Sequence, residues 1–502
     1  TFLTNYFHYQ LRTLPYTPLG NWTFWAEYRA CDNLQIVYWL YNITGDSFLL
    51  DLGKLLHQQS YDYVDMFWNR DDLTRINTIH GVNLAQGIKE PIIYYQQDPD
   101  SLYIHAVKKA FADIRKYHGQ PQGMYGADEA LHGNKPTQGA ELCSIVELMY
   151  SLESMLEITG DIQFADHLEK LAFNALPTQI SDDFMTRQYF QQPNQVMLTR
   201  HIHNFDINHG ETDIVFGLLT GYPCCTSNFH QGWPKFVQNL WYATADNGAG
   251  ALVYAPSEVI LDVANGIPVK IVEKTCYPMN HVVTFDIEFL DKMTESAFFP
   301  FHLRIPSWCR QAEIRINGTL YKKTSGNRTD IIKREWKNGD TVELILPMHI
   351  QISEWYENAV AIERGPLVYA LKIGEKWMKK TVKDDPIRYG KFYYEVLPTT
   401  PWNYGLINCD PAKPENSFIV VEHKDKCKSP FPWNQENAPI EIKTKAKRIP
   451  SWKLYNEMAG PQPYSRMIYG IGNAEFPEEE ITLIPYGCTT LRITEFPVLR
   501  DK

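Results

Sequence analysis

The stretch CSIVELMYSLESMLEITGDIQFADHLEKLAFNAL, residues 143–176, decides how the first half of this chain is interpreted. Ile145, Met149 and Leu152 recur with the 3.6-residue period of a helix that buries one face. The letters ITGD at 158–161 interrupt this pattern, and a second helical run follows them. A short turn makes successive helices antiparallel, so the stretch predicts a helical hairpin.

The same four letters break an earlier helical segment. The stretch CDNLQIVYWLYNITGDSFLLDLGKLLHQQ, residues 31–59, carries ITGD at 43–46 between two apolar runs. Repeated hairpins that bury their faces against one another are typical of helical toroids. We therefore expect residues 1–244 to form one helical domain.

From about residue 245 the period of the pattern changes. Runs such as ALVYAPSEVIL (251–261) and TVELILP (341–347) are short, alternating and rich in β-branched residues, and turn letters such as NG (317–318) separate them. Such runs are typical of antiparallel sandwiches. We expect one β-sandwich over 245–370, with 371–502 forming a second sandwich or an extension of the first.

Composition excludes some partners. The net charge of -11, without a long basic run, argues against nucleic acid and anionic membrane surfaces. No apolar run approaches the ~20 residues that span a bilayer. Nine cysteines in 502 residues do not form a small disulfide framework, and most are expected to be buried thiols. The compartment and the oligomeric state stay open, with a periplasmic or extracellular location slightly favoured over a cytoplasmic one.

Two adjacent cysteines stand out in GYPCCTSNFHQGWP, residues 221–234. Cys224 and Cys225 are poorly placed to pair with each other, because the ring they would close is strained. Upstream, Glu141 and Cys143 lie at the start of a predicted helix, where both side chains can turn to one point. One oxygen and three sulfur atoms would suit zinc. The alternative is three unrelated buried cysteines and a surface glutamate.

A Gly- and Pro-containing loop, GMYGADEALHGNKP, supplies a further acid. Residues 123–136 carry Asp128, Glu129 and His132. Loops on rigid scaffolds often hold catalytic groups, although a solvated loop carboxylate is the simpler interpretation of Glu129.

Several of these motifs together resemble glycoside hydrolase family 127, the β-L-arabinofuranosidases and their close relatives. They are GADE (126–129), ELC (141–143), the cysteine pair followed by Asn228, LRIPSW (303–308) and ERGPLVY (363–369). The resemblance implies an (α/α)6 barrel followed by β-sandwiches. A twelve-helix barrel needs about 300–360 residues, so we expect the first barrel helices to be missing from this sequence.

The family resemblance assigns the site. It implies a zinc ion held by Glu141, Cys143, Cys224 and Cys225, with Cys224 as the nucleophile and Glu129 as the general acid/base. A retaining glycosidase needs such a pair on either side of the bond that it cleaves. Zinc would keep the sulfur of Cys224 deprotonated near neutral pH.

The same resemblance suggests contacts to the sugar. It points to His80 in IHGVNLAQG, to Glu169 in DHLEKLAFN, and to Tyr189 or Phe190 in RQYFQQPNQ, where Gln192-Pro193 stands in place of the Asn-Pro step of the family pattern. His203 in RHIHNFDINHG is a further candidate for a substrate contact. The simpler interpretations are a hydrogen-bonded core histidine for His80 and a solvated helix face for Glu169. The H-x-H of 201–203 could be a second metal site, but a loop that frames the pocket is the favoured interpretation.

We therefore expect a zinc-dependent, retaining exo-glycosidase that releases terminal β-L-arabinofuranose from plant-type oligosaccharides or polysaccharides. Thr226 and Ser227 stand where the family pattern has two prolines, which indicates a divergent branch. Two alternatives are the same mechanism on another furanoside or branched pectic sugar, and a non-catalytic glycan-binding protein with structural zinc.

Overall fold

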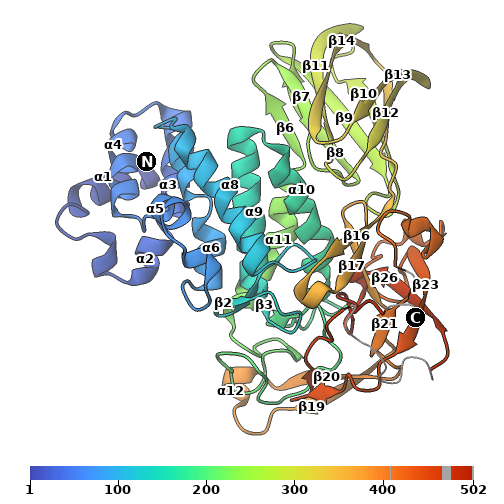
Figure 1. The fold of residues 1–502 in the computed structure, drawn as a ribbon. Coiled ribbons are helices and arrows are strands. Elements are labelled where there is room, and N and C mark those ends of the chain that lie inside the picture. The colour runs from blue at the N-terminus through green and yellow to red at the C-terminus, as the bar shows by residue number, and fades with distance from the viewer. Residues whose placement is uncertain (408, 466–475, 500–502) are drawn as a thin grey trace.

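The fold is described by a computed structural model that covers residues 1–407, 409–465 and 476–499 (Figure 1). Helices fill its first half and strands its second, as predicted. Within the described ranges, no helix combines the length and the apolar character needed to cross a bilayer. The main helices are α1 (Phe2–Thr13), α2 (Phe24–Tyr28), α3 (Ala30–Thr44), α4 (Phe48–Gln59), α5 (Tyr63–Trp68), α6 (Gly81–Gly87), α7 (Glu90–Tyr95), α8 (Ser101–Tyr117), α9 (Leu142–Thr159), α10 (Ile162–Lys170), α11 (Cys224–Gln238) and the short α12 (Pro386–Tyr389).

Both ITGD turns end a helix in the same way. Gly45 and Gly160 adopt left-handed backbone angles, with φ of 71° and 64°, and cap α3 and α9. Thr159 Oγ1 then accepts a hydrogen bond from the N–H of Asp161, and the side chain of Asp161 caps the next helix, α10. Glycine tolerates the left-handed angle without steric cost, which explains why the repeated letters predict both hairpins.

Helix α9 lies at the centre of the helical half and contacts α6, α7, α10 and α11 (Figure 1). Its residues 142–149 and 151–156 are buried, so it is covered on almost every side. A helix buried all round serves as the axis against which neighbouring helices pack.

Two sheets face each other in the first β region. One has the order β13-β12-β15-β10-β9-β8 and the other β14-β11-β7-β6. Trp241 and Phe301 of one sheet both contact Phe285 of the other, with ring centroids 5.7 and 5.3 Å away. The strands are β6 (Trp241–Thr244), β7 (Gly248–Ala251), β8 (Ser257–Val263), β9 (Ile267–Thr275), β10 (Val282–Phe289), β11 (Ser296–Ile305), β12 (Gln311–Ile316), β13 (Thr319–Ser325), β14 (Arg328–Lys337) and β15 (Thr341–Ile345).

A second β region is built around the sheet β16-β17-β18-β26-β23-β21, with β22 paired to β23. A smaller sheet, β19-β20-β5, takes its edge strand β5 from the helical half of the sequence. These strands are β5 (Phe216–Gly217), β16 (Ile350–Glu354), β17 (Val360–Arg364), β18 (Leu367–Leu371), β19 (Glu375–Thr381), β20 (Phe392–Pro398), β21 (Tyr404–Leu406), β22 (Ile419–Glu422), β23 (Ile440–Arg448) and β26 (Glu479–Pro485).

The strand pairing moves both expected domain boundaries. Strand β6 pairs with β7, so the first sandwich begins at Trp241 rather than at residue 245. Strand β18 pairs with β26, which is more than a hundred residues away in the sequence, so β16–β18 belong to the second region. The change between the two β regions therefore falls between Ile345 and Ile350, not at residue 370. The class predicted from the sequence, a helical barrel-type domain followed by antiparallel β domains, is confirmed.

Candidate active site

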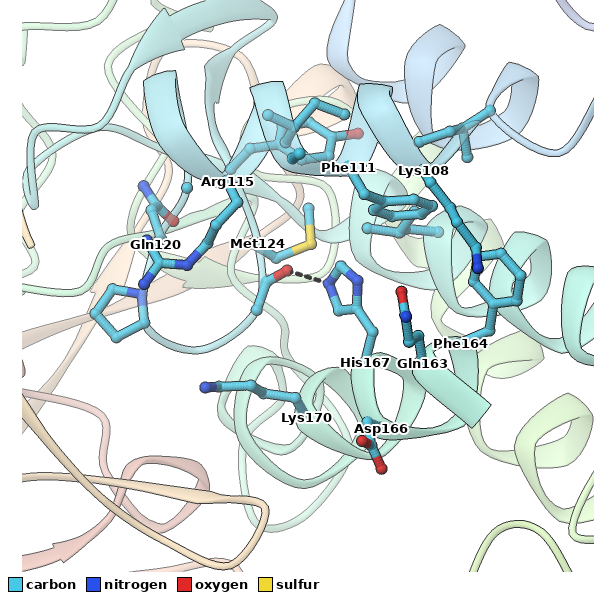
Figure 2. A pocket seen from close by; sticks show the side chains of 18 of the residues that line it. Lys108, Phe111, Arg115, Gln120, Met124, Gln163, Phe164, Asp166, His167 and Lys170 are labelled. Carbon is cyan, nitrogen blue, oxygen red and sulfur yellow. Dashed lines mark hydrogen bonds between the residues drawn. The ribbon is translucent and has the colours of Figure 1, made fainter. Parts of the chain in front are cut away.

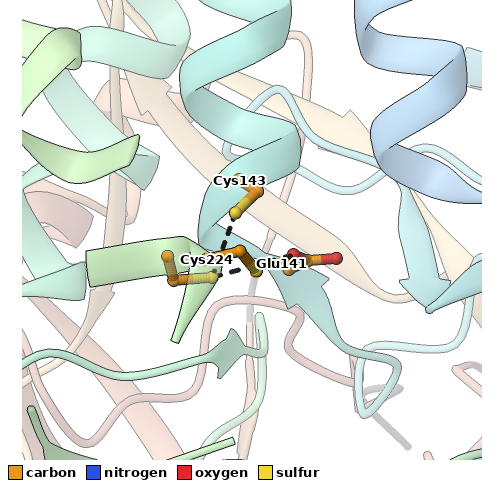
Figure 3. A group of neighbouring side chains, drawn as sticks. Glu141, Cys143 and Cys224 are labelled. Carbon is orange, nitrogen blue, oxygen red and sulfur yellow. Dashed lines mark hydrogen bonds between the residues drawn. The ribbon is translucent and has the colours of Figure 1, made fainter. Parts of the chain in front are cut away.

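The four residues predicted to bind zinc come together where α9 and α11 begin (Figure 3). Glu141 ends the short strand β3 (Ala140–Glu141), Cys143 lies in the first turn of α9, and Cys224 opens α11. The Sγ atoms of Cys143 and Cys225 are 3.4 Å apart. The Sγ atoms of Cys224 and Cys225 lie 3.6 and 3.7 Å from Glu141 Oε1. All four candidate ligand atoms lie within 4.8 Å of one another.

Burial separates one sulfur from the other members of this cluster. Cys143, Cys225 and Glu141 are 1%, 0% and 2% exposed, whereas Cys224 is half-buried. Cys224 is thus the sulfur of this cluster that is most accessible from solvent.

The surroundings of the cluster favour negative charge on Cys224. The N-terminal ends of α9 and α11 both point at it, and helix N-termini carry partial positive charge. Hydrogen bonds from Cys143 and Cys225 lower the pKa of the Cys224 thiol well below its ordinary value. The hydrogen bond to Cys224 raises the pKa of Cys143, and burial raises the pKa values of Cys225 and Glu141.

The donor set fits a metal ion. Glu141 Oε2 is buried and has no hydrogen-bond partner among the described residues. A buried carboxylate oxygen without a partner is costly, and a cation would remove that cost. Three soft sulfur donors with one oxygen suit zinc better than magnesium or calcium.

Glu129 stands at the tip of a small hairpin beside this cluster. It joins β1 (Gly126–Asp128) to β2 (Ala130–Gly133) with a φ of 75°, a left-handed angle that costs energy for a residue with a side chain. Its carbonyl accepts a hydrogen bond of 2.7 Å from the N–H of Gly81. A Cβ atom at Gly81 would lie 2.8 Å from that of Ala127, so glycine permits the close approach of α6.

Three side chains hold the carboxylate of Glu129. The hydroxyl of Tyr189 donates to Oε1 at 2.5 Å, and His80 Nε2 lies 3.0 Å from Oε2. His209 Nε2 lies 3.4 Å from Oε1. One side-chain nitrogen or oxygen from each of His80, Glu129 and Glu141 lies within 4.8 Å of the others. Glu141 also belongs to the cysteine cluster, so it links the two groups. The structure therefore brings together the predicted residues Glu129, His80 and Tyr189.

The neighbours of Glu129 decide its charge. Burial raises the pKa of this carboxyl, but hydrogen bonds from His80 and Tyr189 and the charges of His80 and His209 outweigh that effect and lower the pKa overall. These neighbours therefore favour the ionised form of Glu129.

His209 is oriented by an aspartate that the sequence analysis missed. Asp213 is fully buried, and its Oδ1 lies 2.6 Å from His209 Nδ1 and accepts from the His209 N–H at 3.0 Å. The bond to Asp213 raises the pKa of His209 although burial opposes it. The spacing of four residues in HGETD, 209–213, was the available signal.

Arg187 is a second residue that the sequence analysis missed. Its guanidinium is buried and donates to the carbonyls of Thr220 and Tyr222 and to Thr226 Oγ1, at 3.0 Å for the last. These acceptors flank Cys224 on both sides. The hydroxyl of Thr226, which a proline would lack, thus helps to hold the nucleophile loop in this chain.

Glu169 does not belong to this site. It is fully buried, where its carboxylate pairs with Arg304 of β11 and accepts hydrogen bonds from Tyr254 N–H and the Tyr277 hydroxyl. Asp166 pairs with the same arginine. This corrects the expected sugar contact at Glu169, because its oxygens join the helical domain to the first sandwich.

The histidine loop contributes His209 rather than His203. His203 is 3% exposed, and its ring packs beside those of His201 and Phe205. Burial lowers the pKa of His203 to about 4. Within the described residues, the H-x-H pair gathers no set of metal ligands. The buried His203 thus does not reach the cluster, and His209 is the histidine of this loop that lies beside Glu129.

A cavity of about 570 Å³ lies away from this chemistry (Figure 2). It is lined by α8 and α10, where Phe111, Met124 and Phe164 form apolar walls and His167 Nε2 lies 2.6 Å from the Gly123 carbonyl. None of the cluster residues lines it, so its size does not make it the active site.

Two matches to domain models of a known protein family decide to which family the chain belongs. Residues 3–238 match the catalytic domain of the β-L-arabinofuranosidases of glycoside hydrolase family 127, and residues 251–348 match the middle domain of the same enzymes. The chain belongs to glycoside hydrolase family 127. The resemblance first seen in the cysteine and glutamate motifs is thereby confirmed.

A characterised β-L-arabinofuranosidase is similar over part of its length. The non-reducing end β-L-arabinofuranosidase of Bifidobacterium longum subsp. longum is 26% identical over 243 residues, which are 46% of this chain and 35% of that enzyme. The aligned part thus spans about a third of the relative.

Solved family 127 structures share the fold. A β-L-arabinofuranosidase from Geobacillus stearothermophilus superposes with a TM-score of 0.65 at 18% identity, over 93% of this chain and 72% of that one. Another family 127 β-arabinofuranosidase gives 0.63 at 18% identity, over 93% and 68% of the two chains. The architecture is therefore that of the family over both the helical and the β-rich parts.

Proposed function

We propose that this protein is a zinc-dependent, retaining exo-glycosidase that releases terminal β-L-arabinofuranose from plant-type glycans. The observation that carries the proposal is the contact chain from Cys224 through Glu141 to Glu129. It sets a reachable sulfur nucleophile and a carboxyl group around one space. The sugar is suggested by the names of the relatives, whose substrate need not be the substrate of this chain.

Glu141, Cys143, Cys224 and Cys225 would hold the zinc ion. Bound there, zinc would keep the thiol of Cys224 ionised and stabilise its sulfur as a leaving group. The chain adds to this effect, since two helix N-termini and the donors of Cys143 and Cys225 already favour a thiolate at Cys224.

In the first step, Cys224 Sγ attacks the anomeric carbon and the bond to the leaving oxygen breaks. Glu129 gives that oxygen a proton as the bond breaks. We assign His209 as the neighbour that resupplies Glu129 with a proton. Its Nε2 lies 3.4 Å from Glu129 Oε1, and Asp213 favours its protonated form.

In the second step, Glu129 takes a proton from a water molecule, whose oxygen attacks the same carbon and releases Cys224. Two displacements on one carbon restore the original configuration, which is the retaining outcome. Tyr189 and His80 hold the Glu129 carboxylate between the two steps.

An aryl β-L-arabinofuranoside tests this proposal. Glu129→Gln should lower turnover of a substrate with a poor leaving group by about 10²- to 10⁴-fold, and a substrate with a good leaving group should be less affected. Cys224→Ser should abolish turnover of both. NMR should show that the first product keeps the β configuration.

Two results would redirect the proposal. Hydrolysis of a different aryl furanoside in the same Cys224-dependent way would keep the mechanism and change the sugar. Sugar binding that survives Cys224→Ser, with no cleavage of any glycoside in a panel, would indicate a glycan-binding protein instead of an enzyme.

A further inference from the structure

A second cavity, of about 520 Å³, lies between the second β region and the loop that follows α10. Its lining comes from residues 177–183 of the helical half and from segments around Glu375, Tyr394, Trp433 and Cys488 of the β half. It shares no residue with the site of Cys224 and Glu129. It is therefore a separate concave surface whose ligand must be inferred from its own chemistry.

Three aromatic side chains line this cavity: Trp377, Tyr394 and Trp433. Trp377 is 38% exposed, so part of its ring is open to a ligand. Trp433 stacks on Phe173 at 6.0 Å between centroids, and a Cβ atom at Gly487 would lie 2.9 Å from the Trp433 ring. The rings are thus fixed by their neighbours, and fixed aromatic faces bind apolar surfaces of a ligand at little entropic cost.

Polar groups alternate with the rings. Glu375 is clamped by the N–H groups of Thr490 and Leu491, at 3.0 and 2.9 Å, and by Gln435 at 2.7 Å. The same carboxylate accepts from Trp377 Nε1 at 3.0 Å, which orients the indole. Across the cavity, Asn434 donates to Asp182 at 2.9 Å and ties the two halves of the chain together. Amides and carboxylates of this kind bind hydroxyl groups.

The charge of the lining restricts the ligand. Asp182, Asp183, Glu375 and Glu436 are acidic, and none of the described lining residues is Lys, Arg or His. An anionic ligand would be repelled. These carboxylates do not form a candidate metal site, because none of them belongs to a group of close metal-ligand atoms among the described residues. Among sugar units, neutral ones, which present hydroxyl groups and apolar ring faces, fit this acidic and aromatic lining, and uronic acids do not.

We propose that this cavity is a second carbohydrate site, which binds neutral sugar units of the glycan and excludes uronic acids. This inference rests on the proposed function only for its choice of a plant-type glycan. Strand β5, which pairs with β20 beside Tyr394, leads directly into the loop that carries Cys224. A polymer held here stays near the catalytic site, which raises its effective concentration there.

Affinity electrophoresis in gels that contain soluble neutral arabinan or polygalacturonate tests the site. The wild-type protein should be retarded by arabinan and not by polygalacturonate. Trp377→Ala and Asp182→Ala should each weaken the retardation about five- to tenfold. Tyr321→Ala is the matched control, because Tyr321 is a 50% exposed aromatic residue on β13 of the other β region.

A second readout separates this site from the active site. Glu129→Gln should be retarded like the wild type, and Trp377→Ala should still hydrolyse a small aryl glycoside at the wild-type rate. The inference is overturned if arabinan does not retard the wild type, if both cavity variants are retarded normally, or if Glu129→Gln alone abolishes retardation. Failure of aryl glycoside hydrolysis in the wild type would instead count against the proposed function.

Discussion

Replacing Cys225 with alanine should weaken the proposed zinc site while leaving the fold intact. Cys225 is 0% exposed and lies 3.4 Å from Cys143 Sγ and 3.7 Å from Glu141 Oε1, at the centre of the four-ligand cluster. Protein zinc sites of this type bind with about 10–16 kcal/mol. Losing one ligand of four should remove about 3 kcal/mol, which weakens binding roughly 10²- to 10³-fold.

The same change should alter stability in a way that depends on zinc. At a fixed zinc concentration that saturates the wild type, a hundredfold weaker site loses up to about 2.7 kcal/mol of stabilisation. The metal-free variant loses only the buried sulfur itself, about 1 kcal/mol. The gap in Tm between zinc-loaded and chelator-treated protein should therefore shrink in Cys225→Ala.

Competition with a chromophoric chelator measures the affinity, elemental analysis the zinc content, and thermal unfolding the gap in Tm. Cys31→Ala is the matched control, since Cys31 is 1% exposed and donates its hydrogen bond to the Gln86 carbonyl, outside the cluster. Zinc affinity in Cys225→Ala equal to that of the wild type would refute the four-ligand assignment. So would reduced wild-type protein that neither contains zinc nor responds to the chelator.

Three further predictions follow from contacts around the site. Arg187→Lys should lower kcat for an aryl glycoside about tenfold without loss of zinc, because lysine cannot reach all three acceptors that hold the nucleophile loop; an unchanged kcat would contradict this role. The hydrogen bond to Asp128 raises the pKa of His132 in the folded protein. The protonated His132 therefore stabilises the fold fully below the ordinary pKa of histidine, and this stabilisation is lost as the pH rises through the raised pKa. His132→Gln should flatten the dependence of Tm on pH between about pH 6 and 8, and an unaltered profile would rule this out. Arg304→Met should cost about 3–5 kcal/mol in urea unfolding, because it leaves Glu169 buried without its charged partner; a cost under about 1 kcal/mol would contradict the proposed ion pair.

Local sequence patterns were enough for the helical hairpins and for most of the metal site. ITGD carries its own geometry, since its glycine is left-handed in both turns and, in the second, the following aspartate caps the next helix. The metal ligands form two local pairs, Glu141 with Cys143 and Cys224 with Cys225. Each pair sits at a helix start, so only one long-range contact had to be assumed, and the family resemblance supplied it.

Residues whose roles depend on distant partners were harder to predict. Glu169 was expected at the sugar, but Arg304, 135 residues later in the numbering, draws it into the junction with the first sandwich. His203 and His209 lie in one loop with similar surroundings in the sequence. Only the folded loop shows that His209 faces Glu129 while His203 is buried beside Phe205.

The sequence by itself thus determined the order of helical and β-rich parts, and it singled out the cysteines and glutamates that the fold brings together as candidate metal ligands. The tertiary structure alone decided the boundary between the β regions, the partners that set the charge of Glu129, and the support that Arg187 gives to the Cys224 loop. The physical reason is the range of the forces involved. Turns, caps and helical periodicity act between near neighbours in sequence, whereas strand pairing, buried ion pairs and pKa values depend on groups that meet only when the chain folds.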